Sequence, residues 1–165
     1  MKNYSAKSEG FKKFELFDAE NLLIGSLRYE KWYSYNVELN SSEGISHIKL
    51  EGFWGSKMVQ TNESGEIIRK FKLTWTGIAF EDISGRKYFL KMKSSWKFQY
   101  LLVDEQENEL LAATQDFKWK LYHADISYEV ADHFNCSANL LLAVTHCINY
   151  LTTLTVSSTA AIVAT

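Results

Sequence analysis

Basic side chains gather in two stretches of the chain and give it the most one-sided charge. Residues 86–97 hold five basic residues and no acidic one, and residues 69–72 add three more. Lysine and arginine can hold phosphate groups by charge, and the aromatic residues between them offer stacking surfaces. The alternative is a solvated strand surface, because outward and edge positions of strands are often lysine. The candidate lipid- or phosphate-binding residues are Lys70, Lys72, Arg86, Lys87, Lys91, Lys93 and Lys97.

We recognise no catalytic or metal-binding motif in the sequence. His47, His123, His133 and His146 have no partner at the spacing of a zinc site. The acidic run 104–109 lacks the glycine and the terminal glutamate register of an EF-hand, and it is typical of a solvated turn. No nucleophile elbow and no glycine-rich phosphate loop is present. We therefore expect no metal, no cofactor and no enzymatic activity.

Strands are expected to position the basic residues. Up to Asp132, short runs of alternating apolar and polar residues are separated by turn residues. The aromatic share of 15% and the absence of proline suit continuously paired strands. About a dozen strands follow one another at the spacing typical of an antiparallel sandwich or barrel. They are expected at residues 11–17, 22–32, 35–39, 45–50, 57–61, 67–76, 78–80, 87–93, 97–103, 110–114, 117–123 and 126–130.

The alternation within these runs also predicts which side chains face the core. Successive strand residues point to opposite faces, so lysines that alternate with apolar residues indicate the outer face. The side chains expected inside are Tyr88, Leu90 and Met92 in one strand and Phe117, Trp119 and Leu121 in another.

An uncharged helix is expected after the strands. The 18 Lys and Arg residues and the 20 Asp and Glu residues all precede His133. Apolar residues at helical spacing predict a helix over residues 137–155, with Asn135 or Ser137 as its N-cap. An uncharged tail, residues 156–165, would follow it. A helix without a charged face must be buried in protein or in lipid.

A polar stripe favours burial of this helix in protein. Asn139, His146, Asn149 and Thr153 need hydrogen-bond partners, which a protein interior supplies and lipid does not. A membrane anchor is the alternative, because the uncharged tail could lengthen the span. The short unbroken apolar run, residues 140–144, and the lack of nearby lysine or arginine anchors weigh against it.

The two cysteines indicate a reducing compartment. Cys136 and Cys147 would lie about 16 Å apart along a helix, too far for an internal disulfide. We therefore expect buried thiols. The first ten residues contain no apolar segment of the kind found in signal peptides. We expect a cytoplasmic protein, with peripheral attachment to a membrane as a further option.

A dozen antiparallel strands followed by one apolar helix resemble the tubby C-terminal-like superfamily, and within it the LURP-one-related proteins and the phospholipid scramblases. The likeness extends to Leu154. It implies a closed barrel around a central helix, and phosphoinositides as ligands of the basic surface. No calcium-ligand set and no cysteine-rich lipidation stretch is present, so scramblase activity is not expected. The resemblance rests on the hairpins Asp18-Ala-Glu-Asn21, Asn62-Glu-Ser-Gly65 and Asp82-Ile-Ser-Gly85, and on the ending Asp132-His-Phe with Leu140-Leu-Leu-Ala-Val-Thr-His-Cys-Ile148.

The sequence thus predicts one mainly β (α+β) domain over residues 1–155. Its fold would be a closed antiparallel β-barrel of about twelve strands that encloses the C-terminal helix. The expected function is a non-catalytic binding module that docks to phosphoinositides or anionic phospholipid head groups through outward basic strands. A structural or protein-interaction domain with an unidentified partner is the alternative. A small-molecule carrier would need an empty barrel. A net charge of −2 gives no reason to expect a specific nucleic-acid partner.

Overall fold

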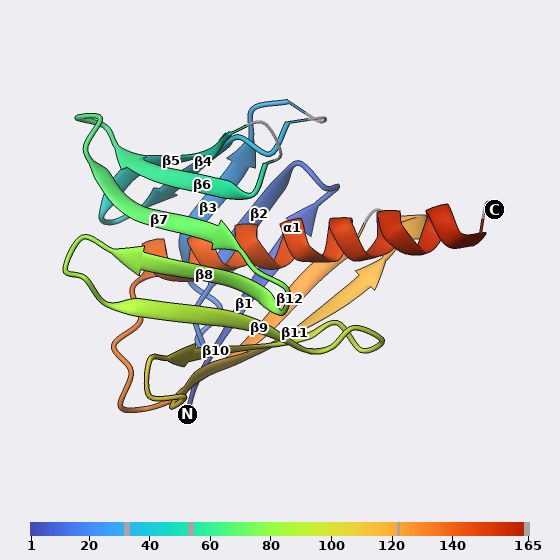
Figure 1. Cartoon of the computed structure of the whole chain (residues 1–165). Coiled ribbons are helices and arrows are strands. Elements are labelled where there is room, and N and C mark those ends of the chain that lie inside the picture. Colours follow the sequence, from blue (N-terminus) through green and yellow to red (C-terminus); the bar gives the residue numbers. More distant parts are fainter. Residues whose placement is uncertain (32–33, 53–54, 122, 164–165) are drawn as a thin grey trace.

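Twelve antiparallel strands close into a barrel (Figure 1). The computed structural model describes residues 1–31, 34–52, 55–121 and 123–163. Each strand pairs with its neighbours in sequence, and β1 (Lys2–Glu9) closes the barrel by pairing with β12 (His123–Val130). The closed twelve-strand barrel predicted from the sequence is confirmed. The other strands are β2 (Lys13–Phe17), β3 (Leu23–Tyr29), β4 (Val37–Ser41), β5 (Gly44–Glu51), β6 (Lys57–Asn62), β7 (Ile67–Leu73), β8 (Gly77–Asp82), β9 (Lys87–Ser94), β10 (Gln99–Asp104) and β11 (Glu109–Lys118).

Two differences from the expected strands cancel in the count. The first strand, β1, was not predicted. The two strands expected at 110–114 and 117–123 are instead one long strand, β11, followed by a short 3₁₀ helix, η1 (Trp119–Leu121). This helix ends the strand alternation, so Leu121 is 71% exposed and its predicted inward position is wrong. In β9 the prediction holds for Tyr88 and Leu90, which are buried.

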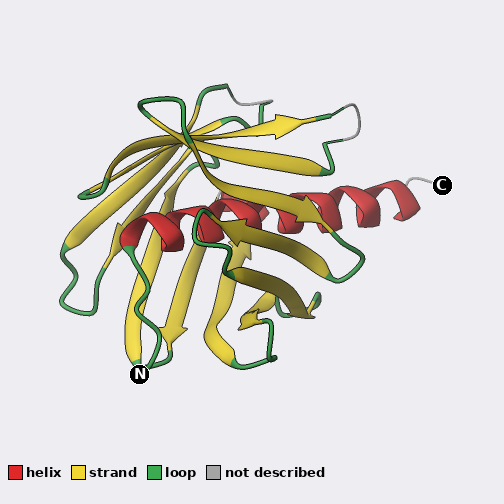
Figure 2. Cartoon of the chain, turned by 60° about the vertical axis from the view of Figure 1, so that its left-hand side comes forward, coloured by secondary structure: helices red, strands yellow, loops and turns green. Residues whose placement is uncertain are grey.

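A single helix, α1 (Ala138–Val163), passes through the barrel (Figure 2). Ser137 is its N-cap, because the Ser137 hydroxyl accepts a hydrogen bond from the backbone N–H of Leu140 at 3.2 Å. The helix is longer than the predicted 137–155 and takes in most of the expected tail. No glycine or proline interrupts residues 138–163, so the sequence contains no stop signal there.

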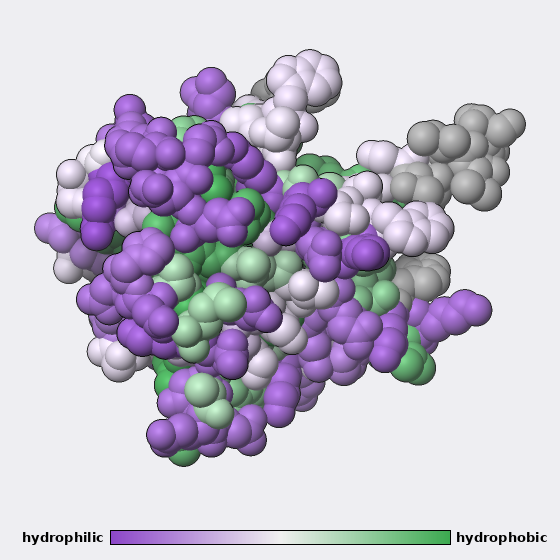
Figure 3. All heavy atoms as spheres, turned by 90° about the horizontal axis from the view of Figure 1, so that it is seen from below, coloured by the Kyte–Doolittle hydropathy of each residue, from purple (hydrophilic) through white to green (hydrophobic). Residues whose placement is uncertain are grey.

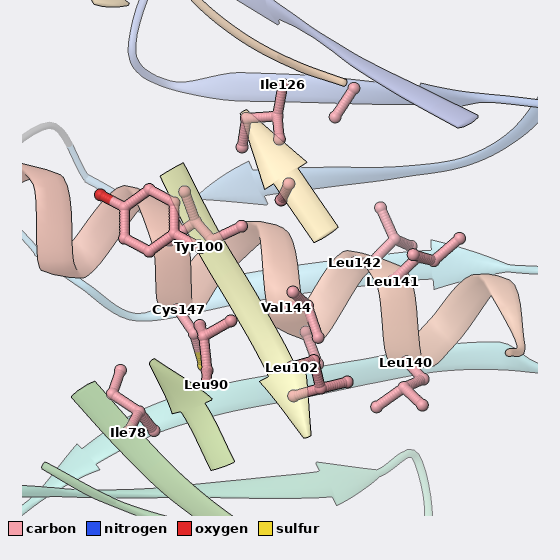
Figure 4. Packing of buried hydrophobic residues seen from close by; sticks show 14 of the residues in the cluster. Ile78, Leu90, Tyr100, Leu102, Ile126, Leu140, Leu141, Leu142, Val144 and Cys147 are labelled. Carbon is pink, nitrogen blue, oxygen red and sulfur yellow. The ribbon is translucent and has the colours of Figure 1, made fainter. Parts of the chain in front are cut away.

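The helix supplies the centre of the core. Leu141, Val144, Cys147 and Ile148 have no exposed side-chain surface, and they pack against inward residues of the strands such as Leu90 and Leu102 (Figure 4). The helix lies closest to β3 and β4. At Gly25 of β3 an added Cβ would lie only 3.0 Å from the Leu142 side chain, so this close approach favours glycine.

Most polar groups in the stripe of α1 are hydrogen-bonded inside the protein, as predicted, but Nε2 of His146 is buried without a hydrogen-bond partner among the described residues. The Tyr29 hydroxyl lies 2.9 Å from Nδ1 of His146 and accepts a hydrogen bond from the Asn149 side chain. The Thr153 hydroxyl donates to the backbone carbonyl of Asn149 at 2.8 Å. Residues 138–158 are long and apolar enough to cross a membrane, yet 72% of the tested window is buried within the protein. The helix is therefore the core of the barrel.

The meander gives the barrel two distinct ends. Because neighbouring strands are antiparallel, alternate connections lie at opposite ends. We call the end where α1 begins the entry end, and the end where α1 leaves the barrel the exit end. The entry-end connections are residues 18–22, 42–43, 63–66, 83–86, 105–108 and 131–137. The exit-end connections are residues 10–12, 30–36, 52–56, 74–76, 95–98 and 119–122.

Candidate anion-binding surface

A groove on the outer wall of β6–β9 brings four lysines together. Lys57 and Lys72 are opposite each other in the β6–β7 pairing, and Lys70 and Lys87 each pair with Glu81 of β8. All four side chains point outward because they alternate with buried residues such as Phe71 and Tyr88. The groove has a volume of about 300 Å³. We call it the lysine groove.

The lysine groove is strongly positive. Glu81 is the one acidic residue in its lining. Within the described ranges, Lys57, Lys70 and Lys72 form no salt bridge, and Lys87 is paired with Glu105 at 3.4 Å. Ala79 and Phe89 provide an apolar floor between the lysines. Such a surface can hold phosphate oxygens by charge while an apolar part of a ligand contacts the floor.

The predicted basic residues divide into three groups. Lys70, Lys72 and Lys87 lie in the lysine groove. Arg86 is paired at 3.0 Å with Asp82 of its own turn, and Lys91 is paired with Glu107 of the neighbouring turn. Lys93 and Lys97 are exposed but lie outside the groove, and Lys97 belongs to the exit-end connection 95–98. Sequence reasoning missed Lys57, which only the β6–β7 register places beside Lys72.

Arg69, which the sequence placed in the same basic stretch, points into the barrel instead. Its guanidinium donates hydrogen bonds to the side-chain oxygens of Asn139 at 2.6 Å and Gln60 at 2.9 Å. Burial lowers the pKa of Arg69, and the nearby carboxylate of Glu43 opposes this shift. Gln60 and Asn139 also bond to Ser46, so the four side chains form one network at the start of α1. We call it the entry network. Its role is structural.

A second groove, of about 330 Å³, opens beside the entry network. Its charged lining residues are Glu43, Asp82, Arg69 and Arg86. Two acids and two bases balance each other, so this groove has no preference for an anion.

The histidines and cysteines show no reactive arrangement. His146 is fully buried beside Tyr29, and burial lowers its pKa to about 3. Burial raises the pKa of the Cys136 thiol to about 12, and Cys147 is buried deeper on α1. Both cysteines are free thiols. In the part of the chain that the structure describes, no three His, Cys, Asp or Glu side chains form a cluster that could hold a metal ion.

The fold defines a class of protein: a closed antiparallel barrel of twelve strands around one central C-terminal helix. The sequence matches no family profile and no curated protein. Among solved structures, the barrel is similar to the X-ray structure of the Arabidopsis thaliana protein AT5G01750, with a TM-score of 0.63 over 91% of each chain and 10% sequence identity. This similarity supports a barrel of the kind that the sequence resemblance implied. At this identity it concerns the fold alone.

Proposed function

We propose that this protein is a non-catalytic module of the tubby-like kind that binds the head groups of anionic membrane lipids, phosphoinositides among them, in the lysine groove. The observation that carries the proposal is the gathering of Lys57, Lys70, Lys72 and Lys87 around a single acid, Glu81. A lysine near an anionic membrane surface contributes about 1 kcal/mol of binding free energy. Four of them in one groove suit a ligand with several phosphate charges.

The proposal also fits the interior of the barrel. The side chains of α1 occupy the space that a small-molecule carrier would keep for its ligand. The lysine groove is open to solvent on the outer wall, where a lipid head group can reach it. The same surface would attach the protein to the cytoplasmic face of a membrane.

Vesicle sedimentation tests the proposal. We would replace Lys70→Glu, Lys72→Glu and Lys87→Glu together and compare binding to phosphatidylcholine vesicles with and without phosphatidylinositol bisphosphate. The variant should bind the anionic vesicles about 100-fold more weakly, because three favourable contacts are lost at about 1 kcal/mol each. The matched control is Lys2→Glu, Lys7→Glu and Arg28→Glu on β1 and β3, across the barrel from the groove.

The control has the same change in net charge, so it separates a specific groove from general attraction. Equal loss in both variants would contradict the groove. If the wild-type protein binds no anionic vesicle at all, the lipid role falls and the protein-interaction alternative takes its place.

A further inference from the structure

The exit end carries exposed tryptophans, whose side chains do not pack in the core of the barrel. Trp75 lies at the tip of the connection 74–76 and is fully exposed, at 104%. Trp96 in the connection 95–98 is 90% exposed, and Leu121 in the connection 119–122 is 71% exposed. Large aromatic side chains are usually at least partly buried in the protein that carries them. Their exposure therefore indicates a surface that contacts another molecule or a membrane.

The tryptophans of the described chain are found at the exit end. Among the described residues, Trp75, Trp96 and the backbone of Trp119 fall within exit-end connections, and no tryptophan falls within an entry-end connection. Trp32 and Trp54 lie outside the described residues.

The two ends also differ in charge. The exit-end connections contain four lysines, Lys12, Lys31, Lys97 and Lys120, and one acid, Glu30. The entry-end connections contain one base, Arg86, and eight acids, which are Asp18, Glu20, Glu43, Glu63, Glu66, Glu105, Glu107 and Asp132. A surface that is negative overall would attract the exit end and repel the entry end.

The helix leaves the barrel among these connections. Figure 1 shows α1 continuing past the strands at the exit end. Ser157 and Ser158 are exposed, and residues 157–163 extend about 10 Å without a charged side chain. Figure 3 shows pale, weakly polar residues gathered beside this end of the molecule. Nothing charged on this part of the helix would oppose entry into a head-group layer.

We propose that the exit end is the face that docks on an anionic lipid bilayer. Trp75 and Trp96 lie at the level of the head groups, Lys12, Lys97 and Lys120 contact the lipid phosphates, and the end of α1 points toward the membrane. Tryptophan prefers this interfacial layer because its ring is apolar and its N–H can hydrogen-bond there. The inference rests on the membrane part of the proposed function, and it adds the face and the orientation.

The test replaces both exposed tryptophans, Trp75→Ser and Trp96→Ser, in the full chain. Its matched control is Leu22→Ser and Ile83→Ser, which removes two exposed apolar side chains, 57% and 79% exposed, at the entry end. Binding is measured on phosphatidylcholine vesicles with and without phosphatidylserine. We expect the tryptophan variant to bind the anionic vesicles about 10-fold more weakly, because it lacks two aromatic rings that would be partly buried in the bilayer of the wild-type complex. The control should bind like the wild-type protein.

A second readout reports depth. Brominated lipids quench tryptophan fluorescence only where the ring reaches the bilayer, so they should quench the bound wild-type protein. The quenched fraction should fall in the tryptophan variant. Unchanged binding or unchanged quenching in that variant would overturn the inference. A change in sedimenting mass without a change in vesicle binding would also overturn it, and would indicate that two copies of the chain meet at this end.

The outcomes separate the two proposals. If the lysine-groove variant loses binding and the tryptophan variant does not, the lipid-binding function stands and the exit-end face is wrong. If the tryptophan variant alone loses binding, the exit-end face stands and the lysine groove is not the contact. If the wild-type protein binds no anionic vesicle, both proposals fall.

Discussion

The entry end and the exit end belong to one barrel but are built from different residues. Four entry-end hairpins share a turn in which an Asp or Asn side chain accepts a hydrogen bond from the backbone N–H four residues later. The pairs are Asp18 with Leu22, Asn62 with Glu66, Asp82 with Arg86, and Asp104 with Asn108. Each of these turns also has a residue with positive φ, at Asn21, Gly65, Gly85 and Glu107. The Asp and Asn side chains of the entry end thus stabilise the local structure of its turns.

The exit end has local side-chain hydrogen bonds of its own, such as that from the Thr74 hydroxyl to the carbonyl of Gly77 at 3.1 Å, but it also carries two exposed tryptophans. Trp75 and Trp96 make no comparable contribution to their turns, because both side chains are exposed. The helix shows the same contrast: Asn139 is tied into the entry network, whereas the Ser158 hydroxyl bonds only to the carbonyl of Leu154 in its own helix. The two ends therefore differ in degree: the entry network lies at the entry end, and the two exposed tryptophans lie at the exit end, although Tyr150 of α1 also donates a hydrogen bond to the carbonyl of Gly55 there.

The largest expected effect is at the entry network. Asn139→Ala removes one of the two side-chain acceptors of the Arg69 guanidinium, the other being Gln60, and leaves buried polar groups of the entry network unpaired. We expect a loss of about 3 kcal/mol in the free energy of unfolding, measured by urea denaturation. The control is Ser158→Ala near the other end of α1, which should change it by less than about 0.5 kcal/mol. Similar losses in both variants would remove the contrast between the ends.

In the middle of α1, between the two ends, His146 should make the stability of the protein depend on pH. Burial depresses the pKa of His146 to about 3, so the unfolded chain takes up a proton on this residue before the folded protein does. The resulting stability is present above the unfolded pKa near 6.5 and is lost progressively as pH falls toward the folded pKa. Between pH 7 and pH 5 the loss from this residue should be about 2 kcal/mol.

This pH effect is isolated by comparison with His146→Gln. Urea denaturation of both proteins at the two pH values should show a steeper fall for the wild-type protein. Parallel falls would mean that His146 does not titrate as its burial implies.

A smaller effect is expected at a single entry-end turn. Asp82→Ala removes hydrogen bonds from the backbone of Ser84 and Arg86, and should cost about 1 kcal/mol. Although partial burial opposes the shift, hydrogen bonds from Ser84 and Arg86 lower the pKa of Asp82. Its stabilisation is therefore present above the unfolded carboxyl pKa and is lost as pH falls through the lower folded value. Thermal unfolding at neutral and acid pH would show this difference shrinking in acid.

The smallest effect on stability should come from the exit end. Trp75→Ser and Trp96→Ser together should change the free energy of unfolding by less than about 0.5 kcal/mol, because neither side chain is packed. Urea denaturation of the same variant that is used on vesicles provides the measurement. A loss as large as that of Asp82→Ala would show that these tryptophans stabilise the fold. Their exposure would then no longer indicate a contact surface.

The architecture could be predicted from sequence because alternation, turn residues and helical spacing are local signals. The sequence analysis did not predict β1, because its inward positions carry Tyr4 and Ala6 rather than branched apolar residues. Its pairing with β12 also joins the first and last strands, which no local pattern indicates. Gln115 resembled a turn between strands. It is instead buried in β11, where the Thr152 hydroxyl of α1 donates a hydrogen bond to it.

The candidate site was predictable only in part for the same reason. The lysines of β7 and β9 stand out in the sequence, but which of them remain unpaired depends on the acidic turns beside them. Asp82 pairs with Arg86 four residues later in the same turn, whereas Glu107 lies beside Lys91 from a different turn, a pairing that no local pattern reveals. The contrast between the two ends emerges only when the connections are sorted by their place in the barrel.

The position of α1 in the chain also has a consequence for biosynthesis. A ribosome makes all twelve strands before it makes the helix that fills them. Contacts such as that between Tyr29 and His146 join residues 117 positions apart, which is a feature of slowly folding proteins. The apolar inner faces of the strands therefore lack their central partner until α1 has been made, and exposed apolar surface of this kind is prone to aggregation. The barrel can be completed only after α1 has been synthesised.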